Sequence, residues 1–257
     1  MSRSRIRVVA AFLSILAVVL LTGSARGGDA GLGVESVKVS TARGVQLEAS
    51  LHRPAKPNGC AVVMASGQSG GRERAVPKRT SEALAAAGFT VVRFDWAYFT
   101  AKGEPSADLA TEVADLDGAV AFARGIKGVT KVIVAGKSLG TMVAIARLEK
   151  KPDDAAALLL LTLPLTQGDP AATAREGMDG LLHTKIPALV VVGDHDPLCP
   201  LPVLYAYAAK AETPFRVVVV PGDHSLSKAK GDESETEENV GLCASAAVLW
   251  ARRFVGS

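Results

Sequence analysis

The apolar residues of this chain of 257 residues fall into short runs, separated by longer stretches of mixed polarity. Several runs are nearly continuous and rich in valine, isoleucine and leucine, as is typical of parallel strands covered on both faces. The predicted strands are 60–65, 89–95, 130–135, 156–162, 186–192 and 215–220. The predicted helices are 73–87, 106–124, 141–148, 201–210 and 236–254. Strands that alternate with helices in this way predict a parallel sheet with right-handed crossovers.

The segment 34–54 has a different pattern. Apolar and polar positions alternate there with a period of two, for example at Val37 and Val39, which predicts an antiparallel pair of strands. The segment 163–185 is too short to hold a large cap domain. We therefore expect an α/β fold with a mostly parallel, doubly wound sheet of about eight strands and no large cap.

The segment 136–140, with the sequence GKSLG, lies between the predicted strand 130–135 and the predicted helix 141–148. A G-x-S-x-G sequence between a strand and a helix is typical of a nucleophile elbow. Its glycines permit a sharp, strained turn that projects the hydroxyl of Ser138 from the strand end. The N-terminus of the following helix favours an oxyanion at the same place. This context predicts Ser138 as a nucleophile.

A second stretch with the same pattern, GQSGG at 67–71, follows the predicted strand 60–65. The chain contains 25 glycines, so a chance match is not rare, and partner residues must decide between the two serines. A serine hydroxyl needs an imidazole that takes its proton and a carboxylate that orients the imidazole. In α/β-hydrolases the acid and then the histidine follow the serine along the chain, each at the end of a strand.

Two predicted strands after Ser138 end in such residues. The strand 186–192 runs into Asp194 and Asp196, and the strand 215–220 runs into His224. Open α/β sheets bind ligands beyond these carboxyl ends. We assign Asp196 as the acid, because it lies further into the loop and precedes a proline, and we keep Asp194 as the alternative. His224 is assigned as the base, since it alone of the four histidines follows a late strand and a glycine turn.

The glycine-rich loop 66–71 is interpreted as an oxyanion loop, and Ser69 as part of it. One oxyanion donor is expected to be the backbone N–H of Leu139, the residue after the nucleophile. Gln68 is our choice for the second N–H, because the glycines around it allow the backbone to approach a substrate carbonyl closely. A flexible glycine loop without a chemical role remains the alternative.

Together these segments make the chain resemble the α/β-hydrolase superfamily, and it is most similar to small, lid-poor members related to dienelactone hydrolases. The resemblance covers about residues 35–255, and the segments that carry it are 66–71, 136–140, 193–196 and 222–224. Two features depart from the family. Many members have histidine where this chain has Ser66, and dienelactone hydrolases use a cysteine where this chain has Ser138. The resemblance implies a hydrolase of carboxylic esters or thioesters of small molecules, which forms an acyl-enzyme and needs no metal or cofactor.

The end of the predicted strand 89–95 carries three aromatic residues close together, Trp96, Tyr98 and Phe99. They are candidates for the lining of a substrate pocket. Burial of Trp96 and Phe99 in the core is the equally favoured alternative.

The first 25 residues have the pattern of an export signal. A basic start with Arg3, Arg5 and Arg7 precedes the apolar segment 8–21, and small residues follow up to Ala25. We expect cleavage after Ala25 and a periplasmic or secreted protein. An uncleaved membrane anchor is the alternative, although the apolar stretch is short for a transmembrane span.

The formal net charge of the whole chain is +3, and the segment 1–25 carries three arginines and no acid, so its removal leaves 3 − 3 = 0. A neutral protein gives no reason to expect nucleic acid or an anionic membrane surface as a partner. Residues 33–257 are long enough for one large α/β domain, which we expect to act on a small-molecule ester.

The three cysteines, Cys60, Cys199 and Cys243, make an odd number. An oxidising compartment would permit one disulfide, and Cys199 with Cys243 is the candidate pair, because both flank segments near the predicted catalytic edge. Three unpaired thiols are an equally open alternative. None of the cysteines lies at an elbow, so a thiol nucleophile is not expected.

Two functions of other classes compete with the serine hydrolase. Asp194, His195, Asp196, Asp223 and His224 include the oxygen and imidazole groups that a metal-dependent hydrolase would need. A non-catalytic binding protein that keeps the hydrolase fold is the second rival, since a fold does not determine a function. The candidate triad argues against both.

Overall fold

The computed structural model describes residues 33–152, 154–169, 173–227 and 233–255, with the backbone alone for 233–235. The predicted signal segment 1–25 lies outside the described residues. Everything described belongs to one compact unit. No described helix is both long and apolar enough to cross a membrane.

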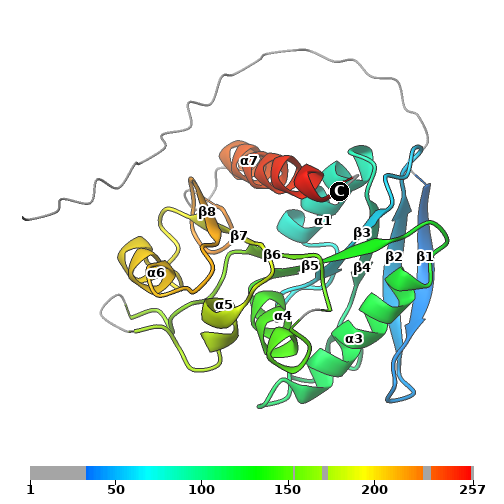
Figure 1. The fold of residues 1–257 in the computed structure, drawn as a ribbon, viewed down its shortest axis with the longest axis horizontal. Coiled ribbons are helices and arrows are strands. Elements are labelled where there is room, and N and C mark those ends of the chain that lie inside the picture. The colour runs from blue at the N-terminus through cyan, green and yellow to red at the C-terminus, as the bar shows by residue number, and fades with distance from the viewer. Residues whose placement is uncertain (1–32, 153, 170–172, 228–232, 256–257) are drawn as a thin grey trace, which may run out of the picture. The chain divides into compact units, whose positions relative to one another are not determined.

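Eight strands make up a single sheet. They are β1 (Gly33–Ser40), β2 (Gln46–Arg53), β3 (Cys60–Ala65), β4 (Thr90–Phe94), β5 (Lys131–Lys137), β6 (Ala157–Leu161), β7 (Ala188–Gly193) and β8 (Arg216–Val220). Their order across the sheet is β1-β2-β4-β3-β5-β6-β7-β8 (Figure 1). β2 pairs antiparallel with both β1 and β4, and all other neighbours are parallel. The predicted fold class, a mostly parallel sheet of about eight strands, is confirmed.

Helices cover both faces of the sheet. The described helices are α1 (Ala75–Ala86), α2 (Ala97–Thr100), α3 (Ala110–Arg124), α4 (Leu139–Lys150), α5 (Asp179–His183), α6 (Leu201–Ala208), α7 (Glu233–Ala251) and a 3₁₀ turn (Arg252–Phe254). α1 and α7 lie on one face, and α3 and α4 on the other (Figure 1). The sequence pattern missed α2 and α5, because helices of four and five residues are too short to show a period.

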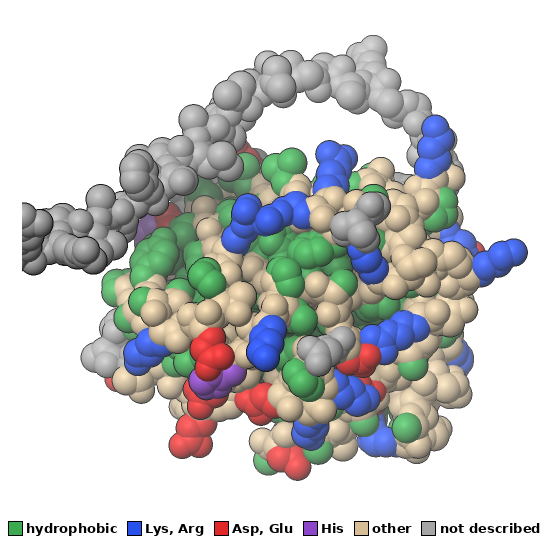
Figure 2. All heavy atoms as spheres, in the orientation of Figure 1, with side chains coloured by type: hydrophobic (Ala, Val, Ile, Leu, Met, Phe, Trp, Pro, Cys, Tyr) green, Lys and Arg blue, Asp and Glu red, His purple; other side chains and the backbone are tan. Residues whose placement is uncertain are grey.

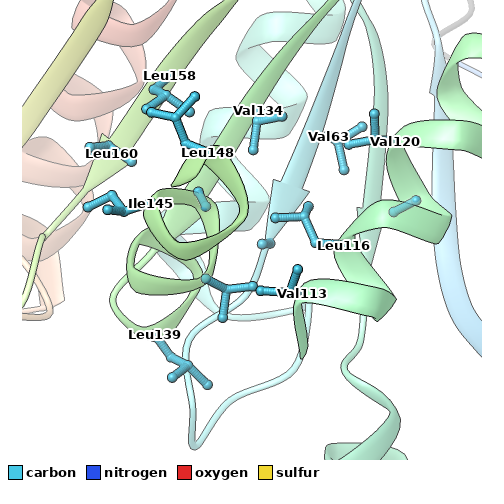
Figure 3. Packing of buried hydrophobic residues seen from close by; sticks show 14 of the residues in the cluster. Val63, Val113, Leu116, Val120, Val134, Leu139, Ile145, Leu148, Leu158 and Leu160 are labelled. Atoms are coloured by element: carbon cyan, nitrogen blue, oxygen red, sulfur yellow. The ribbon is translucent and has the colours of Figure 1, made fainter. Parts of the chain in front are cut away.

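Each central strand contributes side chains to two separate hydrophobic clusters, one on each face of the sheet. In β5, Val132 and Val134 belong to the cluster under α3 and α4, whereas Ile133 and Ala135 belong to the cluster under α1 and α7. Figure 3 shows part of the first cluster, with Val134 of β5 and Ile145 and Leu148 of α4 among its labelled residues. Because successive side chains of a strand point to opposite faces, a strand covered on both sides is expected to be apolar at most positions. This is why the strands appear in the sequence as continuous apolar runs.

The described cysteines are all buried and unpaired. Cys199 belongs to the cluster under α3 and α4, and Cys243 to the cluster under α1 and α7. The sheet therefore separates the two, and the candidate Cys199–Cys243 disulfide is wrong, because the two thiols face opposite sides of it. Burial raises the pKa of Cys60 to about 11 and the pKa values of the other two thiols to about 12.

The carboxyl edge of the sheet carries no cap domain in the described part of the chain. The described residues between β6 and β7 form loops and the short helix α5. The edge where the strand-end residues lie is therefore not covered by a cap within the described part of the chain. On the face drawn in Figure 2, Lys and Arg side chains are spread among neutral and apolar ones.

Candidate active site

Ser138 occupies the turn between β5 and α4. Its φ of 52° and ψ of −117° are rare for a residue with a side chain and indicate local strain. The backbone closes tightly here, since a Cβ on Gly136 would lie 2.3 Å from the carbonyl carbon and oxygen of Gly140. A Cβ on Gly140 would lie 2.6 Å from the carbonyl oxygen of Ala65. The segment GKSLG therefore has the geometry of a nucleophile elbow.

His224 lies in the loop after β8, and Asp196 in the loop after β7. Nε2 of His224 is 2.8 Å from Oγ of Ser138, and Nδ1 of His224 is 2.8 Å from Oδ2 of Asp196. The side chain of Asp196 is fully buried, and that of His224 is 18% exposed. Oδ1 of Asp196 accepts a hydrogen bond of 2.9 Å from the N–H of Leu198. The structure thus brings the three residues assigned from the sequence into one hydrogen-bonded chain.

Asp194, the alternative acid, has a different set of contacts. Its Oδ1 accepts a hydrogen bond of 2.8 Å from the N–H of Gly222 and lies 2.7 Å from Nδ1 of His195. The hydrogen bonds from His195 and Gly222 lower the pKa of Asp194. No hydrogen bond joins Asp194 to His224 within the described residues. Asp194 therefore links the loops after β7 and β8, and Asp196 is the carboxylate that holds the imidazole.

The loop 66–71 lies beside the nucleophile. A Cβ on Gly67 would lie 3.5 Å from Cβ of Ser138. Within the described part of the chain, the backbone N–H groups of Gln68 and Leu139 donate to no other group of the protein. Both are therefore free to donate to a substrate oxygen. Ser69 lies in the same loop and has no hydrogen bond to a described histidine, so Ser138 is the serine paired with an imidazole.

The three aromatic residues after β4 do not act as one pocket lining. Trp96 is 1% exposed and donates a hydrogen bond of 2.9 Å from its indole N–H to the carbonyl of Ser66, so it belongs to the core. The hydroxyl of Tyr98 donates 3.0 Å to the carbonyl of Gln68, and burial raises the pKa of this hydroxyl, which keeps its proton in place. Tyr98 and Phe99 line a neighbouring cavity that has the loop 66–71 as a wall. Trp96 and Tyr98 thus donate hydrogen bonds to two carbonyls of the loop 66–71.

A cavity of about 450 Å³ opens at Ser138 and His224, and we call it the Ser138 cavity. Gln68 and its neighbours form one wall, and the start of α1 forms another. Lys137 and Arg74 also line it. Burial, more than any other cause, lowers the pKa of Lys137.

Sequence reasoning missed Lys137, Arg74 and the role of Tyr98. A signal for Lys137 was present, because the period of two along β5 places it on the same face as Ile133 and Ala135. Nothing local could have assigned Arg74 or Tyr98, since their contacts depend on how the loop 66–71 folds against them.

The structure also bears on the metal-dependent rival. Among the described residues, no three histidine, cysteine, aspartate or glutamate side chains form a group that could hold a metal ion. The imidazole of His224 is already in contact with both Asp196 and Ser138.

A strained serine elbow on an eight-stranded, mostly parallel sheet is the architecture of the α/β-hydrolase fold. The family model described as "alpha/beta hydrolase domain" matches residues 58–252, more than half of the chain. The chain therefore belongs to the α/β-hydrolase family, as the resemblance in its sequence implied.

Solved structures with this fold are similar along most of their length. A serine hydrolase without a lid from Xanthomonas campestris is 17% identical, with a TM-score of 0.68, and the match covers 87% of this chain and 96% of that one. The esterase domain of a Rhodothermus marinus protein is 19% identical, with a TM-score of 0.66 and coverage of 88% and 100%. A dienelactone hydrolase from Anabaena variabilis is 21% identical, with a TM-score of 0.65 and coverage of 87% and 99%. Among curated proteins, none matches the chain significantly in sequence.

Proposed function

We propose that this protein is a serine hydrolase that cleaves carboxylic ester or thioester bonds of a small substrate through an acyl-enzyme on Ser138. The observation that carries the proposal is the hydrogen-bonded chain from Ser138 through His224 to Asp196, at 2.8 Å on each side of the imidazole. Family membership supports a hydrolase, and the esterase among the similar structures is consistent with ester substrates.

In the first half of the reaction, Oγ of Ser138 attacks the carbonyl carbon while Nε2 of His224 takes the hydroxyl proton. The carbonyl π bond opens, and its electron pair moves to the oxygen, which accepts hydrogen bonds from the N–H groups of Gln68 and Leu139. The tetrahedral intermediate then collapses. The bond to the leaving oxygen or sulfur breaks, and His224 returns the proton to it, which leaves the acyl group on Ser138.

In the second half, water attacks the acyl carbon while His224 takes one of its protons. The bond to Oγ breaks, Ser138 recovers the proton from His224, and the carboxylic acid leaves. Asp196 keeps the proton on Nδ1 of His224, so that Nε2 is the acceptor that the hydroxyl needs. The loss of one oxyanion donor in such a site raises the barrier by about 3–4 kcal/mol.

Labelling with a fluorophosphonate, followed by mapping of the modified peptide, tests the proposal. We expect the label on Ser138 and no label in the Ser138→Ala variant. The Ser69→Ala variant is the matched control, because Ser69 occupies the other G-x-S-x-G stretch, and it should still be labelled. A label on Ser69, or undiminished hydrolysis of p-nitrophenyl acetate by a folded Ser138→Ala variant, would refute the assignment. A folded wild type without label or hydrolysis would favour the non-catalytic binding protein.

We also propose that residues 1–25 direct export, with cleavage after Ala25. The support is the basic start and the apolar segment 8–21. Expression of the full chain in a bacterial host, fractionation and N-terminal sequencing test this. The expected product lies outside the cytoplasm and begins at Arg26, whereas an intact N-terminus in the membrane fraction would favour an anchor.

A further inference from the structure

The described lining of the Ser138 cavity carries positively charged side chains and no negatively charged ones. The two cations in this lining are Lys137 and Arg74. Other lining side chains carry hydroxyl groups besides that of the nucleophile, and they are Ser69, Ser225, Ser227 and Thr236. Since a hydroxyl can donate a hydrogen bond as well as accept one, these walls suit a negatively charged group.

Lys137 is the last residue of β5 and precedes the nucleophile directly. Its side chain lies along the oxyanion loop, with Cδ 3.3 Å from the position that a Cβ on Gly67 would take. Within the described residues, the ammonium of Lys137 has no hydrogen bond and no ion pair. Because burial is the main cause that lowers the pKa of Lys137, an additional negative charge nearby would stabilise its protonated form.

The charged groups around Lys137 do not supply that partner. Asp196 and Asp223 act on its charge from a distance, and Arg74 opposes them. Asp196 uses its two oxygens for His224 and a backbone N–H. Asp223 accepts hydrogen bonds of 2.7 and 3.0 Å from two backbone N–H groups of its own loop. The ammonium is therefore only partly compensated.

Arg74 is the residue before α1, and its side chain lines the same cavity. Its side chain lies flat across Gly70, since a Cβ there would be 2.4 Å from its Cγ and Nε. Among the described residues, the only hydrogen bond of its guanidinium is a long one of 3.5 Å to the carbonyl of Ser69. The neighbouring Arg72, by contrast, is paired with Asp95. Glycines of the oxyanion loop thus make room for two cations that no described carboxylate neutralises.

We propose that the Ser138 cavity selects esters whose acyl part carries a carboxylate, which Lys137 and Arg74 bind. The acyl group is the part that stays attached to Ser138, so it has to lie in this cavity until water releases it. Hydrogen bonds between charged partners are stronger than neutral ones, and a partly desolvated site favours them further. This inference rests on the proposed function and assigns its substrate class.

The test compares two esters with the same six-carbon acyl chain. Mono-p-nitrophenyl adipate carries a free carboxylate at the far end of its acyl chain, and methyl p-nitrophenyl adipate carries a neutral ester there. After subtraction of spontaneous hydrolysis, kcat/KM of the wild type should be about 10- to 100-fold higher for the charged ester. Lys137→Met and Arg74→Met, which keep a stem without the charge, should each lower this ratio about tenfold or more. Lys150→Met, at the exposed end of α4, is the control and should leave the ratio unchanged.

The outcomes separate this inference from the proposed function. Hydrolysis of both esters through Ser138 with a ratio near one, or a ratio that Lys137→Met leaves intact, would overturn the carboxylate site and keep the serine hydrolase. A larger preference for a carboxylate on the leaving group, tested with the acetate of p-hydroxybenzoate, would also overturn it. Binding of adipate to the Ser138→Ala variant, measured by calorimetry, needs no turnover. We expect binding that Lys137→Met abolishes, and its absence in the Ser138→Ala variant would refute the proposal even if no ester is hydrolysed.

Discussion

Replacing Asp196 by asparagine should lower kcat about 10³- to 10⁴-fold while the protein stays folded, because the amide cannot hold the imidazole in its working tautomer. In the wild type, Oδ1 of Asp196 accepts from the N–H of Leu198, and Oδ2 faces Nδ1 of His224. An asparagine that keeps the first contact turns its NH₂ group toward Nδ1. The histidine proton then moves to Nε2, which can no longer accept the proton of Ser138.

The alternative rotamer of the asparagine at position 196 sets the lower limit of the loss in kcat. If the amide oxygen faces Nδ1 of His224, the NH₂ group meets the N–H of Leu198, and a buried donor loses its acceptor at a cost of about 1–3 kcal/mol. That cost corresponds to about 5- to 150-fold in rate. The imidazolium formed during the reaction also loses the neighbouring negative charge. A loss smaller than about tenfold is therefore incompatible with the proposed role of Asp196.

The matched control is Asp194→Asn. Asp194 accepts a hydrogen bond from the N–H of Gly222 and contacts the exposed His195, and an asparagine oxygen could still accept from Gly222. The kcat of the Asp194→Asn variant should stay within about fivefold of the wild-type value, since surface pairs of this kind contribute little. Initial rates with p-nitrophenyl acetate near neutral pH, together with thermal unfolding of both variants, measure the effects. A large loss in Asp194→Asn beside a small loss in Asp196→Asn would reverse the assignment of the acid.

Three further perturbations follow from the structure. Tyr98→Phe removes the hydroxyl that holds the oxyanion loop, so kcat should fall about tenfold with little change in KM, and an unchanged kcat would remove Tyr98 from this role. Gly136→Ala would press a Cβ against backbone 2.3 Å away, so the free energy of unfolding in urea should fall by about 3 kcal/mol, and wild-type stability would contradict the tight turn. Arg147→Met removes a buried guanidinium between two carboxylates and should cost about 2–4 kcal/mol at neutral pH. Burial raises the pKa of Asp154, but hydrogen bonds from Arg124 and Arg147 outweigh burial and lower it. The stability lost in Arg147→Met should therefore shrink as the pH falls through that lowered pKa, because a protonated Asp154 no longer pairs with Arg147. A loss of stability that does not depend on pH would argue against the Arg147–Asp154 ion pair.

The parts that could be predicted from the sequence are those that a local pattern encodes. β3 (Cys60–Ala65) is apolar at every position and its parallel neighbours are mostly apolar, because both faces of the sheet are covered, so the runs could be recognised without knowledge of the partners. The residues that follow such strands must come to the same edge, since the carboxyl ends of parallel strands meet there. For this reason Ser138, Asp196 and His224 could be proposed as neighbours although they are far apart in the chain.

The parts that could not be predicted depend on which face of the sheet a side chain takes and on what packs against it. Cys199 and Cys243 flank the same edge in the sequence, but the folded sheet stands between them. Trp96 and Tyr98 follow a strand end like a pocket lining, yet their polar atoms point to carbonyls of the loop 66–71, because that loop folds back over them.

The chain order and spacing of the apolar runs were therefore sufficient to predict the α/β sheet, and the sequence GKSLG between a strand and a helix predicted the elbow at 136–140. The hydrogen-bond partner of each polar atom was determined only by the tertiary structure, since contacts between distant loops form only when the layers of the domain pack together. Lys137 and Arg74 illustrate the difference. Each is an ordinary basic residue in the sequence, and they come to face one cavity because glycines of a separate loop let both side chains lie close to its backbone.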